Sequence, residues 1–267
     1  RVFEPLRTER NSYIPILSKA RKLIKSIGSI AVARKITVLL LASISLIATS
    51  GCSGDDIIAW GKGWSPTSAQ SGLVFVTSRE GEVIAVDTTG RTPQVEWRFT
   101  PGEDYQFKSA FNPPVIGNDF IYVTATTDRS GDGGIIYCLR KDRTTGSDIR
   151  SDTGEWVKQI DGAIVGSPVL TETLVITGSD DGKLYAFYAK GDRPGRLAWT
   201  YTTDGPIWST PTVDQDNVYF GSMDHYIYAI SINDENPGKL TWRFKTGGAV
   251  LSSPLIIEEK LIVGAFD

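Results

Sequence analysis

The chain has 267 residues, of which 40% are hydrophobic and seven are Trp, enough to build a sizeable core in one or two domains. Its formal net charge is −3, but residues 1–51 carry nine Lys/Arg against two Asp/Glu, so the rest of the chain carries −10. An acidic body without a Lys/Arg cluster does not match the phosphate backbone of nucleic acids, and we therefore expect no DNA or RNA partner.

Residues 32–52 have the pattern of an export signal. Two basic residues precede thirteen uncharged residues, 36–48, and small residues then lead to Cys52. The apolar run is shorter than the ~20 residues that a membrane-spanning helix needs, so it predicts a secretory signal peptide. The sequence Thr-Ser-Gly-Cys-Ser, residues 49–53, resembles the lipobox of bacterial lipoproteins, although Thr49 stands where Leu is usual. The resemblance implies lipidation of Cys52 and a membrane anchor; an ordinary signal peptide or an N-terminal anchor is the alternative.

The chain opens with Arg1, and Met223 is its only methionine. Both facts suggest that residues 1–31 are a non-native or upstream extension and that translation begins just after them from a non-ATG codon. On this interpretation residues 32–52 are the lipoprotein signal peptide with the lipidation Cys, and residues 53–267 are the folded part.

A repeat of 43 residues organises the second half of the chain. The segments SPVLTETLVITGSDDGKLYAF, TPTVDQDNVYFGSMDHYIYAI and SPLIIEEKLIVGAFD begin at Ser167, Thr210 and Ser253. The spacing is kept by three kinds of landmark: Pro168, Pro211 and Pro254; Gly178, Gly221 and Gly264; Trp199 and Trp242. Two earlier units fit with insertions, after Pro66 and Pro114, and the extra residues of the longer unit are polar and glycine-rich, as in surface loops.

Each unit reads as four short β-strands. Residues 174–179 and 183–188 are rich in β-branched and aromatic side chains and are separated by Asp181-Gly182, a pair typical of tight hairpins. A proline-led strand precedes this hairpin and a Trp-containing strand follows it. Four antiparallel strands repeated every ~40–50 residues predict an all-β fold, a β-propeller of about four blades plus a partial fifth. A solenoid or another open β-array is the alternative.

The last residue, Asp267, has the repeat register of Asp181 and Asp224, so the sequence stops at the turn of its fifth hairpin. Propellers have ~4–8 blades arranged around a central channel. Because the fifth hairpin lacks its second strand, we expect an open fragment, truncated at its C-terminus, with exposed sheet edges that favour aggregation.

The segments GRLAWTYTTDGPIWSTP and GKLTWRFKTGGAVLSSP, residues 195–211 and 238–254, resemble the repeat of the PQQ-like, or quinoprotein-type, propellers. The resemblance extends over residues 64–267. In that family the repeated Trp docks one blade on the next, which implies this structural role for Trp97, Trp156, Trp199 and Trp242. A large aromatic ring with one N–H donor suits such a junction on physical grounds as well.

No residue is predicted to be catalytic, to bind a cofactor or to hold a metal. His225, the single His, stands at the hairpin position of Gly182, where an exposed turn residue has no second His or Cys with which to share a metal. Cys138 has the register of three alanines and is expected to fill a tight, inward-facing site: Ala85, Ala186 and Ala229.

Two further patterns are interpreted as structural. The adjacent pairs Asp55-Asp56 and Asp180-Asp181 read as turn or solvent residues, because neighbouring strand residues point to opposite faces. Gly131, Gly133 and Gly134 lack the rest of a phosphate-binding motif.

A lipoprotein with PQQ-like blades resembles the propeller lipoprotein of the outer-membrane β-barrel assembly machinery, which implies a non-enzymatic, exported scaffold that binds envelope proteins. The alternative is a periplasmic PQQ-dependent oxidoreductase with cofactor residues partly in missing blades; a third reading is an extracellular ligand sensor or adhesin with a further domain. Quinoprotein dehydrogenases close eight blades, and many carry a vicinal disulfide and a calcium ligand set. None of these is visible in this sequence, so the scaffold is favoured, with no cofactor.

Overall fold

The computed structural model describes residues 67–78, 81–110, 112–127 and 133–267, which all belong to one compact unit, Trp60–Asp267. The predicted extension and signal peptide, with Cys52, lie outside these residues. The described chain is β throughout except for two 3₁₀ turns, Glu103–Tyr105 and Ser151–Thr153. None of its helices has the length and hydrophobicity required to cross a membrane.

Three of the sheets have four antiparallel strands that pair in chain order. The first contains β1 (Ser68–Gln70), β2 (Leu73–Thr77), β3 (Val83–Asp87) and β4 (Gln94–Phe99). The third contains β10 (Val169–Leu170), β11 (Leu174–Gly178), β12 (Lys183–Tyr188) and β13 (Leu197–Thr202). The fourth contains β14 (Thr212–Val213), β15 (Asn217–Gly221), β16 (Tyr226–Ser231) and β17 (Leu240–Lys245).

The second sheet differs from the other three because it has a fifth strand that the repeat did not predict. It consists of β5 (Phe107–Ser109), β6 (Val115–Ile116), β7 (Phe120–Thr127), β8 (Gly134–Arg140) and β9 (Trp156–Ile160). The strand β7 has eight residues, whereas its counterpart β11 has five. The short strand β6 pairs only with the first half of β7, so the backbone N–H and C=O groups along the second half of that edge remain open to another strand. Those groups are taken by β5 at Thr126 and Thr127.

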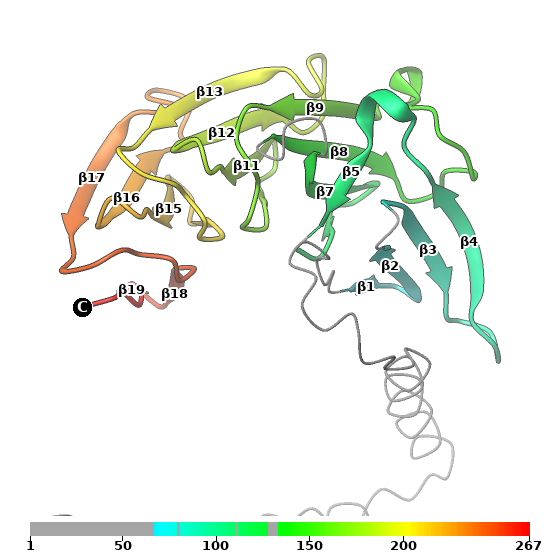
Figure 1. Ribbon diagram of the computed structural model, residues 1–267, viewed down its shortest axis with the longest axis horizontal. Helices are drawn as coiled ribbons and strands as arrows, with labels where there is room; N and C mark the ends of the chain where they lie inside the picture. The colour runs from blue at the N-terminus through cyan, green and yellow to red at the C-terminus, as the bar shows by residue number, and fades with distance from the viewer. Residues whose placement is uncertain (1–66, 79–80, 111, 128–132) are drawn as a thin grey trace, which may run out of the picture. The chain divides into compact units, whose positions relative to one another are not determined.

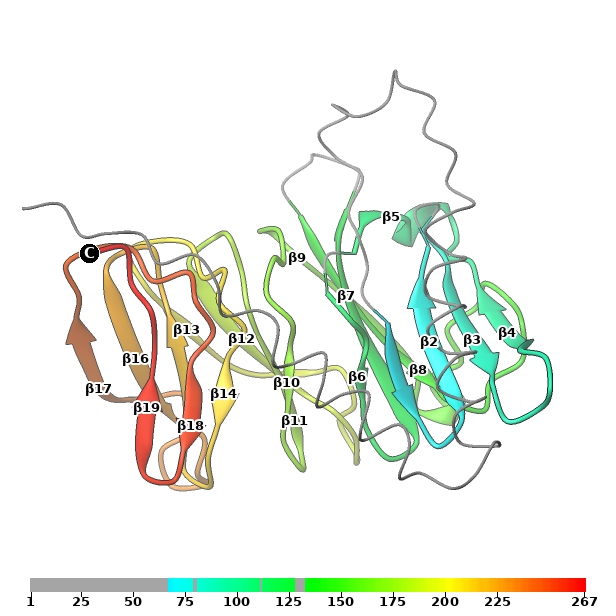
Figure 2. The ribbon, with the colours of Figure 1, turned by 90° about the horizontal axis from the view of Figure 1, so that it is seen from below.

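A last pair of strands, β18 (Leu255–Ile257) and β19 (Lys260–Ile262), forms a two-stranded sheet in the register of β14 and β15. Figure 1 shows the sheets side by side in chain order from β1–β4 to β18–β19, and Figure 2 shows the short inner strands β6, β10, β14 and β18 one after another. The first and last sheets share no strand pairing, so the described sheets do not close into a ring.

The hydrophobic core lies between consecutive sheets, in three clusters. The first lies between sheets one and two around Trp97 and Tyr137, the second between sheets two and three around Trp156 and Phe187, and the third between sheets three and four around Ile176 and Phe220. A sheet with a neighbour on each side buries both faces of its central strands, which is why β11 is apolar at successive positions and buried throughout.

Main-chain hydrogen bonds join consecutive sheets at positions that repeat every 43 residues. The loops that leave the second, third and fourth sheets each offer a carbonyl oxygen to an N–H at the end of the second strand of the next sheet or in the turn after it. These bonds run from Asp180 N to Ala163 O (2.9 Å), from Met223 N to Pro206 O (2.9 Å) and from Phe266 N to Ala249 O (3.0 Å). The junction therefore repeats as closely as the sheets themselves.

Candidate functional site

The first two of the four repeated tryptophans lie buried between sheets. The Trp97 indole N–H donates to the carbonyl oxygen of Lys141 in the second sheet region at 2.8 Å. The Trp156 N–H points in the same way to Ala189 O, after the third sheet's β12, at 3.4 Å. Each acceptor lies three residues after the small residue of the repeat, Cys138 or Ala186, so both rings use an equivalent contact with the following sheet.

The other two tryptophans have the same place in the repeat but different surroundings. The ring of Trp199 packs against the third core cluster, and its N–H is buried without a hydrogen-bond partner among the described residues. Trp242 is 40% exposed and packs on Tyr219 of its own sheet, with ring centroids 5.8 Å apart.

Two glycines of the following sheet form the surface on which the rings of Trp156 and Trp199 lie. Gly195 has φ +69°, and a Cβ built on it would lie 2.8 Å from Cγ of Trp156. Gly238, 43 residues later, has φ +78°, and its Cβ would lie 3.0 Å from Cγ of Trp199. A side chain at either glycine would strain the backbone and displace the ring.

Cys138 is fully buried on β8, directly opposite Trp156 on β9. The alanines of the other sheets stand opposite their own tryptophans in the same way: Ala85 and Trp97, Ala186 and Trp199, Ala229 and Trp242. Burial raises the pKa of the Cys138 thiol well above its ordinary value. The structure thus places this Cys as a small, neutral core side chain.

His225 lies at the β15–β16 turn with φ +73°. Gly81 and Gly182 have the same turn position with φ +84° and +78°. The His225 N–H donates to Ser222 O at 3.3 Å, and its carbonyl accepts from Thr246 N at 2.9 Å. The imidazole is exposed. The backbone of His225 makes the same two hydrogen bonds in its turn as the backbone of Gly182 makes in the third sheet.

The Asp residues before Gly182 and before His225 each accept a hydrogen bond from the Tyr hydroxyl four residues later. The Tyr185 hydroxyl donates to Asp181 at 2.5 Å, and the Tyr228 hydroxyl donates to Asp224 at 2.6 Å. Burial alone would raise the pKa of Asp181, but hydrogen bonds from Tyr185 and Lys183 hold it below its ordinary value. Burial and the adjacent carboxylate raise the pKa of Tyr185. The neighbouring Asp180 instead accepts from the Trp208 indole N–H at 2.6 Å, so the pair serves two separate contacts.

A buried ion pair in the long insertion of the second unit is a feature that sequence reasoning missed. The loop after β8 sends Arg143 inward, where its guanidinium lies 4.5 Å from the ring centroid of Phe99 and 3.8 Å from a carboxylate oxygen of Glu155. Glu155 also accepts the backbone N–H groups of Arg140 and Arg150, both at 3.0 Å. Only part of this polar insertion is therefore the surface loop that its composition suggested.

The remaining sequence patterns do not come together into a reactive site. The described residues contain no group of three or more His, Cys, Asp or Glu placed to hold a metal ion. A Cβ on Gly134 would lie 2.6 Å from Gly162 O, so this glycine allows close packing between sheets two and three. The Asp55-Asp56 pair and Gly131 lie outside the described residues.

Four-stranded antiparallel sheets stacked face to face through a repeated Trp define this chain as a β-propeller type of repeat protein. Residues 132–236 match the family described as outer membrane protein assembly factor BamB. This match confirms the predicted resemblance to the PQQ-like propeller repeat. No curated protein matches the chain.

Solved structures support the fold. BamB from Moraxella catarrhalis is 18% identical, with a TM-score of 0.54 over 76% of this chain and 58% of that chain. The computationally designed Ika8 protein is 14% identical, with a TM-score of 0.53 over 74% of this chain and 54% of that chain. The WD40 β-propeller domain of Doa1 is 14% identical, with a TM-score of 0.51 over 74% of this chain and 60% of that chain. The predicted all-β propeller architecture is confirmed, and the match spans little more than half the length of each of these structures.

Proposed function

We propose that this chain is a non-enzymatic scaffold of the cell envelope that binds other proteins during outer-membrane protein assembly. The observation that carries the proposal is the match of residues 132–236 to the family described as outer membrane protein assembly factor BamB. We further propose that the protein is exported and anchored to a membrane through a lipid on Cys52.

The chemistry of the described side chains supports a scaffold. The groups with the largest pKa shifts all take part in packing or turn contacts: Tyr122, Tyr137, Cys138, Tyr185 and Tyr228. Their shifts follow from burial first, and the Asp partners of Tyr185 and Tyr228 belong to hairpin turns. Shifted groups are functional candidates only when no structural contact explains them, and here a contact does.

A genetic experiment tests the assembly role. Deletion of the gene in its host should lower the amount of folded β-barrel protein in the outer membrane, and the wild-type gene should restore it. The Cys52→Ala variant should accumulate without a lipid and restore assembly poorly. Normal levels of every outer-membrane barrel protein in the deletion strain would contradict the proposal.

A binding experiment separates the scaffold from the oxidoreductase alternative. The purified protein is heated with and without pyrroloquinoline quinone and calcium, because a ligand that binds only the folded state raises the melting temperature. A scaffold should show no shift and no quinone-dependent dye reduction. A saturable shift together with dye reduction would replace the scaffold with an enzyme.

A further inference from the structure

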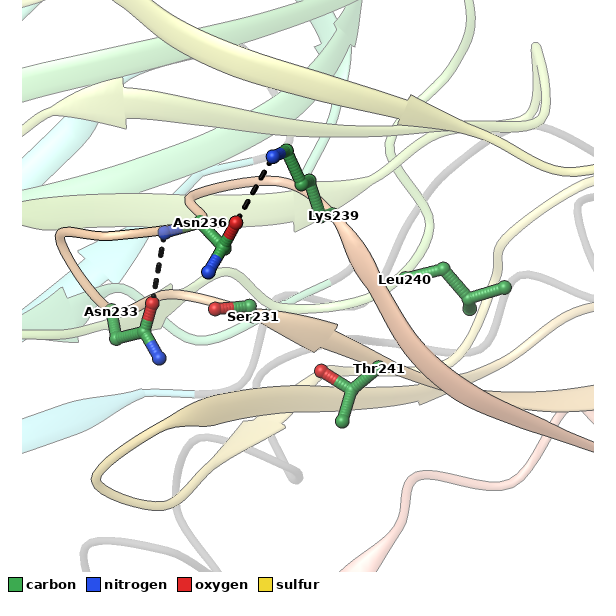
Figure 3. A pocket seen from close by; sticks show the side chains of 6 residues that line it. All are labelled: Ser231, Asn233, Asn236, Lys239, Leu240 and Thr241. Carbon is green, nitrogen blue, oxygen red and sulfur yellow. Dashed lines mark hydrogen bonds between the residues drawn. The ribbon is translucent and has the colours of Figure 1, made fainter.

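The loop between β16 and β17 borders a cavity of about 270 Å³ that is open to solvent (Figure 3). Its lining consists of Ser231, Asn233, Asn236, Lys239, Leu240 and Thr241. Five of these six side chains are polar, and Ser231 lies at the end of β16 with its residue 6% exposed. The Ser231 hydroxyl is buried and has no hydrogen-bond partner among the described residues.

A difference between two repeats explains why the cavity exists. The β12–β13 loop has the same backbone hydrogen bonds: Gly195 N to Tyr188 O and Gly238 N to Ser231 O are both 2.8 Å. The repeat position of Ser231 is held there by Tyr188, whose ring is covered by the Arg193 guanidinium at 5.2 Å. In the fourth sheet Ser231 stands in place of Tyr188, and Asn236 in place of Arg193. The loop backbone is kept, but both large side chains are absent.

Most of the polar groups in the cavity that make no hydrogen bond to the protein are hydrogen-bond donors. The Asn233 side-chain oxygen already accepts the Asn236 backbone N–H at 3.0 Å, and the Asn236 side-chain oxygen accepts from Lys239 Nζ at 3.0 Å (Figure 3). These bonds fix the orientation of both amides. The two amide NH₂ groups, two further ammonium hydrogens and the Ser231 hydroxyl are left to meet a ligand.

We propose that this cavity is a binding site for a carboxylate, a function beyond the scaffold role and independent of it. A carboxylate offers only acceptor oxygens, and it would pair with the Lys239 ammonium and the amide groups of Asn233 and Asn236. Asp234 and Glu235 lie on the same loop and are exposed, without lining the cavity. Their charges oppose an anion, so we expect weak binding, with Kd near ~1 mM.

The carboxylate could come from an acidic side chain of another protein or from a free small acid, and two probes distinguish these sources. The ¹⁵N-labelled full chain is titrated with sodium acetate, and separately with a Gly-Glu-Gly peptide blocked at both ends. The signals of the Asn233 and Asn236 side-chain amides are followed by NMR. Saturable shifts with either probe support the site, and tighter binding of the peptide or of acetate assigns the source. The same peptide with Gln in place of Glu should cause no saturable shift.

Three variants control the experiment. Ser231→Tyr restores the side chain found at position 188 and should abolish the shifts by filling the cavity. Lys239→Met should weaken binding about tenfold or more, and it alters an exposed residue, so the fold is not at risk. Lys260→Met removes an exposed Lys outside the cavity and should leave binding unchanged. No saturable shift with either probe, or equal binding by wild type, Ser231→Tyr and Lys239→Met, would overturn the proposal.

Discussion

Cys138 and Trp156 face each other on adjacent strands of the second sheet, the Cys in β8 and the Trp in β9. In the other sheets Ala occupies the Cys position opposite Trp. The pairing leaves room for only a small side chain beneath the large ring that docks on the next sheet. A change in volume at Cys138 therefore acts on a whole junction between sheets.

We expect Cys138→Ala to be tolerated and Cys138→Leu to be harmful. The Ala variant reproduces the pair found in the other sheets and should lower the free energy of unfolding by less than ~1 kcal/mol, whereas Leu overpacks the site and should cost ~1–3 kcal/mol. Urea unfolding followed by Trp fluorescence measures both. Because burial shields the Cys138 thiol and raises its pKa, Cys138 should also resist iodoacetamide at pH 8 in the native protein and react only after unfolding.

Gly195 gives a test of the Trp156 junction with a matched control. Gly191 also has a positive φ, +89°, but a Cβ built on it meets nothing within 4 Å. Gly191→Ala should therefore show only the backbone cost, ~1 kcal/mol, while Gly195→Ala adds a clash with the Trp156 ring and should cost ~2–4 kcal/mol. Equal losses of unfolding free energy in the two variants would show that the Trp156 ring moves aside without an energetic cost.

His225→Gly should stabilise the protein. His225 has a left-handed backbone that costs a non-glycine residue ~1 kcal/mol or more, and part of this gain is offset by the larger unfolded-state entropy of Gly. We expect a net gain of ~0.5 kcal/mol in urea unfolding. The converse change, Gly182→Ala at the same turn position of the third sheet, should lose ~1 kcal/mol. A loss of stability in His225→Gly would show that the imidazole itself makes a contact of value.

The Asp181–Tyr185 bond predicts a specific pH dependence of stability. The folded state lowers the pKa of Asp181, so this contribution is present above the ordinary carboxyl pKa and is lost as the pH falls through the lower, folded value. Tyr185→Phe should lower the free energy of unfolding by ~1 kcal/mol at pH 7, and the difference from wild type should shrink at pH 3.

Tyr201→Phe is the control for this pH experiment. No hydrogen bond of the Tyr201 hydroxyl is found in the part of the chain that the structure describes, and Phe244 holds its place in the next repeat. The control should match wild type at both pH values. A Tyr185→Phe effect of the same size at pH 7 and pH 3 would show that the Asp181 charge plays no part.

The buried pair of Arg143 and Glu155 should be sensitive to the loss of either partner. Glu155→Gln removes the charge that faces the guanidinium and leaves the buried Arg143 without its carboxylate partner, so we expect a loss of ~3 kcal/mol. Arg143→Met combined with Glu155→Gln should cost less than the sum of the single changes. Asp142→Asn, which breaks the exposed pair with Arg140, should cost less than ~1 kcal/mol. Similar losses in Glu155→Gln and Asp142→Asn would contradict the importance of burial.

The repeat register predicted most of the fold, because landmarks such as Trp199 and Trp242 occupy backbone positions that recur. The same register placed His225 on a turn and Cys138 at a tight, inward-facing site, but it did not show that this site lies opposite a tryptophan. It could not predict β5, which pairs with the last two residues of the longer strand β7. It could not predict the Arg143–Glu155 pair either, because charged residues in a polar loop give no sign that tertiary contacts will bury them.

The cavity at Ser231 was invisible in the sequence for a different reason. A small polar residue at the end of a strand is unremarkable until it is compared with its counterpart in the neighbouring sheet, the much larger Tyr188, which packs against the third core cluster. The signal was present in the aligned repeats as an exchange of Tyr for Ser and of Arg for Asn. Only the shared loop backbone shows that this exchange leaves an empty volume.

The main-chain bonds between sheets, such as Met223 N to Pro206 O, use atoms that every residue carries except the proline nitrogen. Mutation can therefore exchange many side chains at a junction while these bonds persist. A similar fold is found in solved structures at sequence identities of 14–18%. The main-chain bonds also make the 43-residue unit modular. An in-frame duplication of residues 167–209 would carry the Asp180 N–H that bonds to the preceding sheet and the Pro206 carbonyl that bonds to the following one.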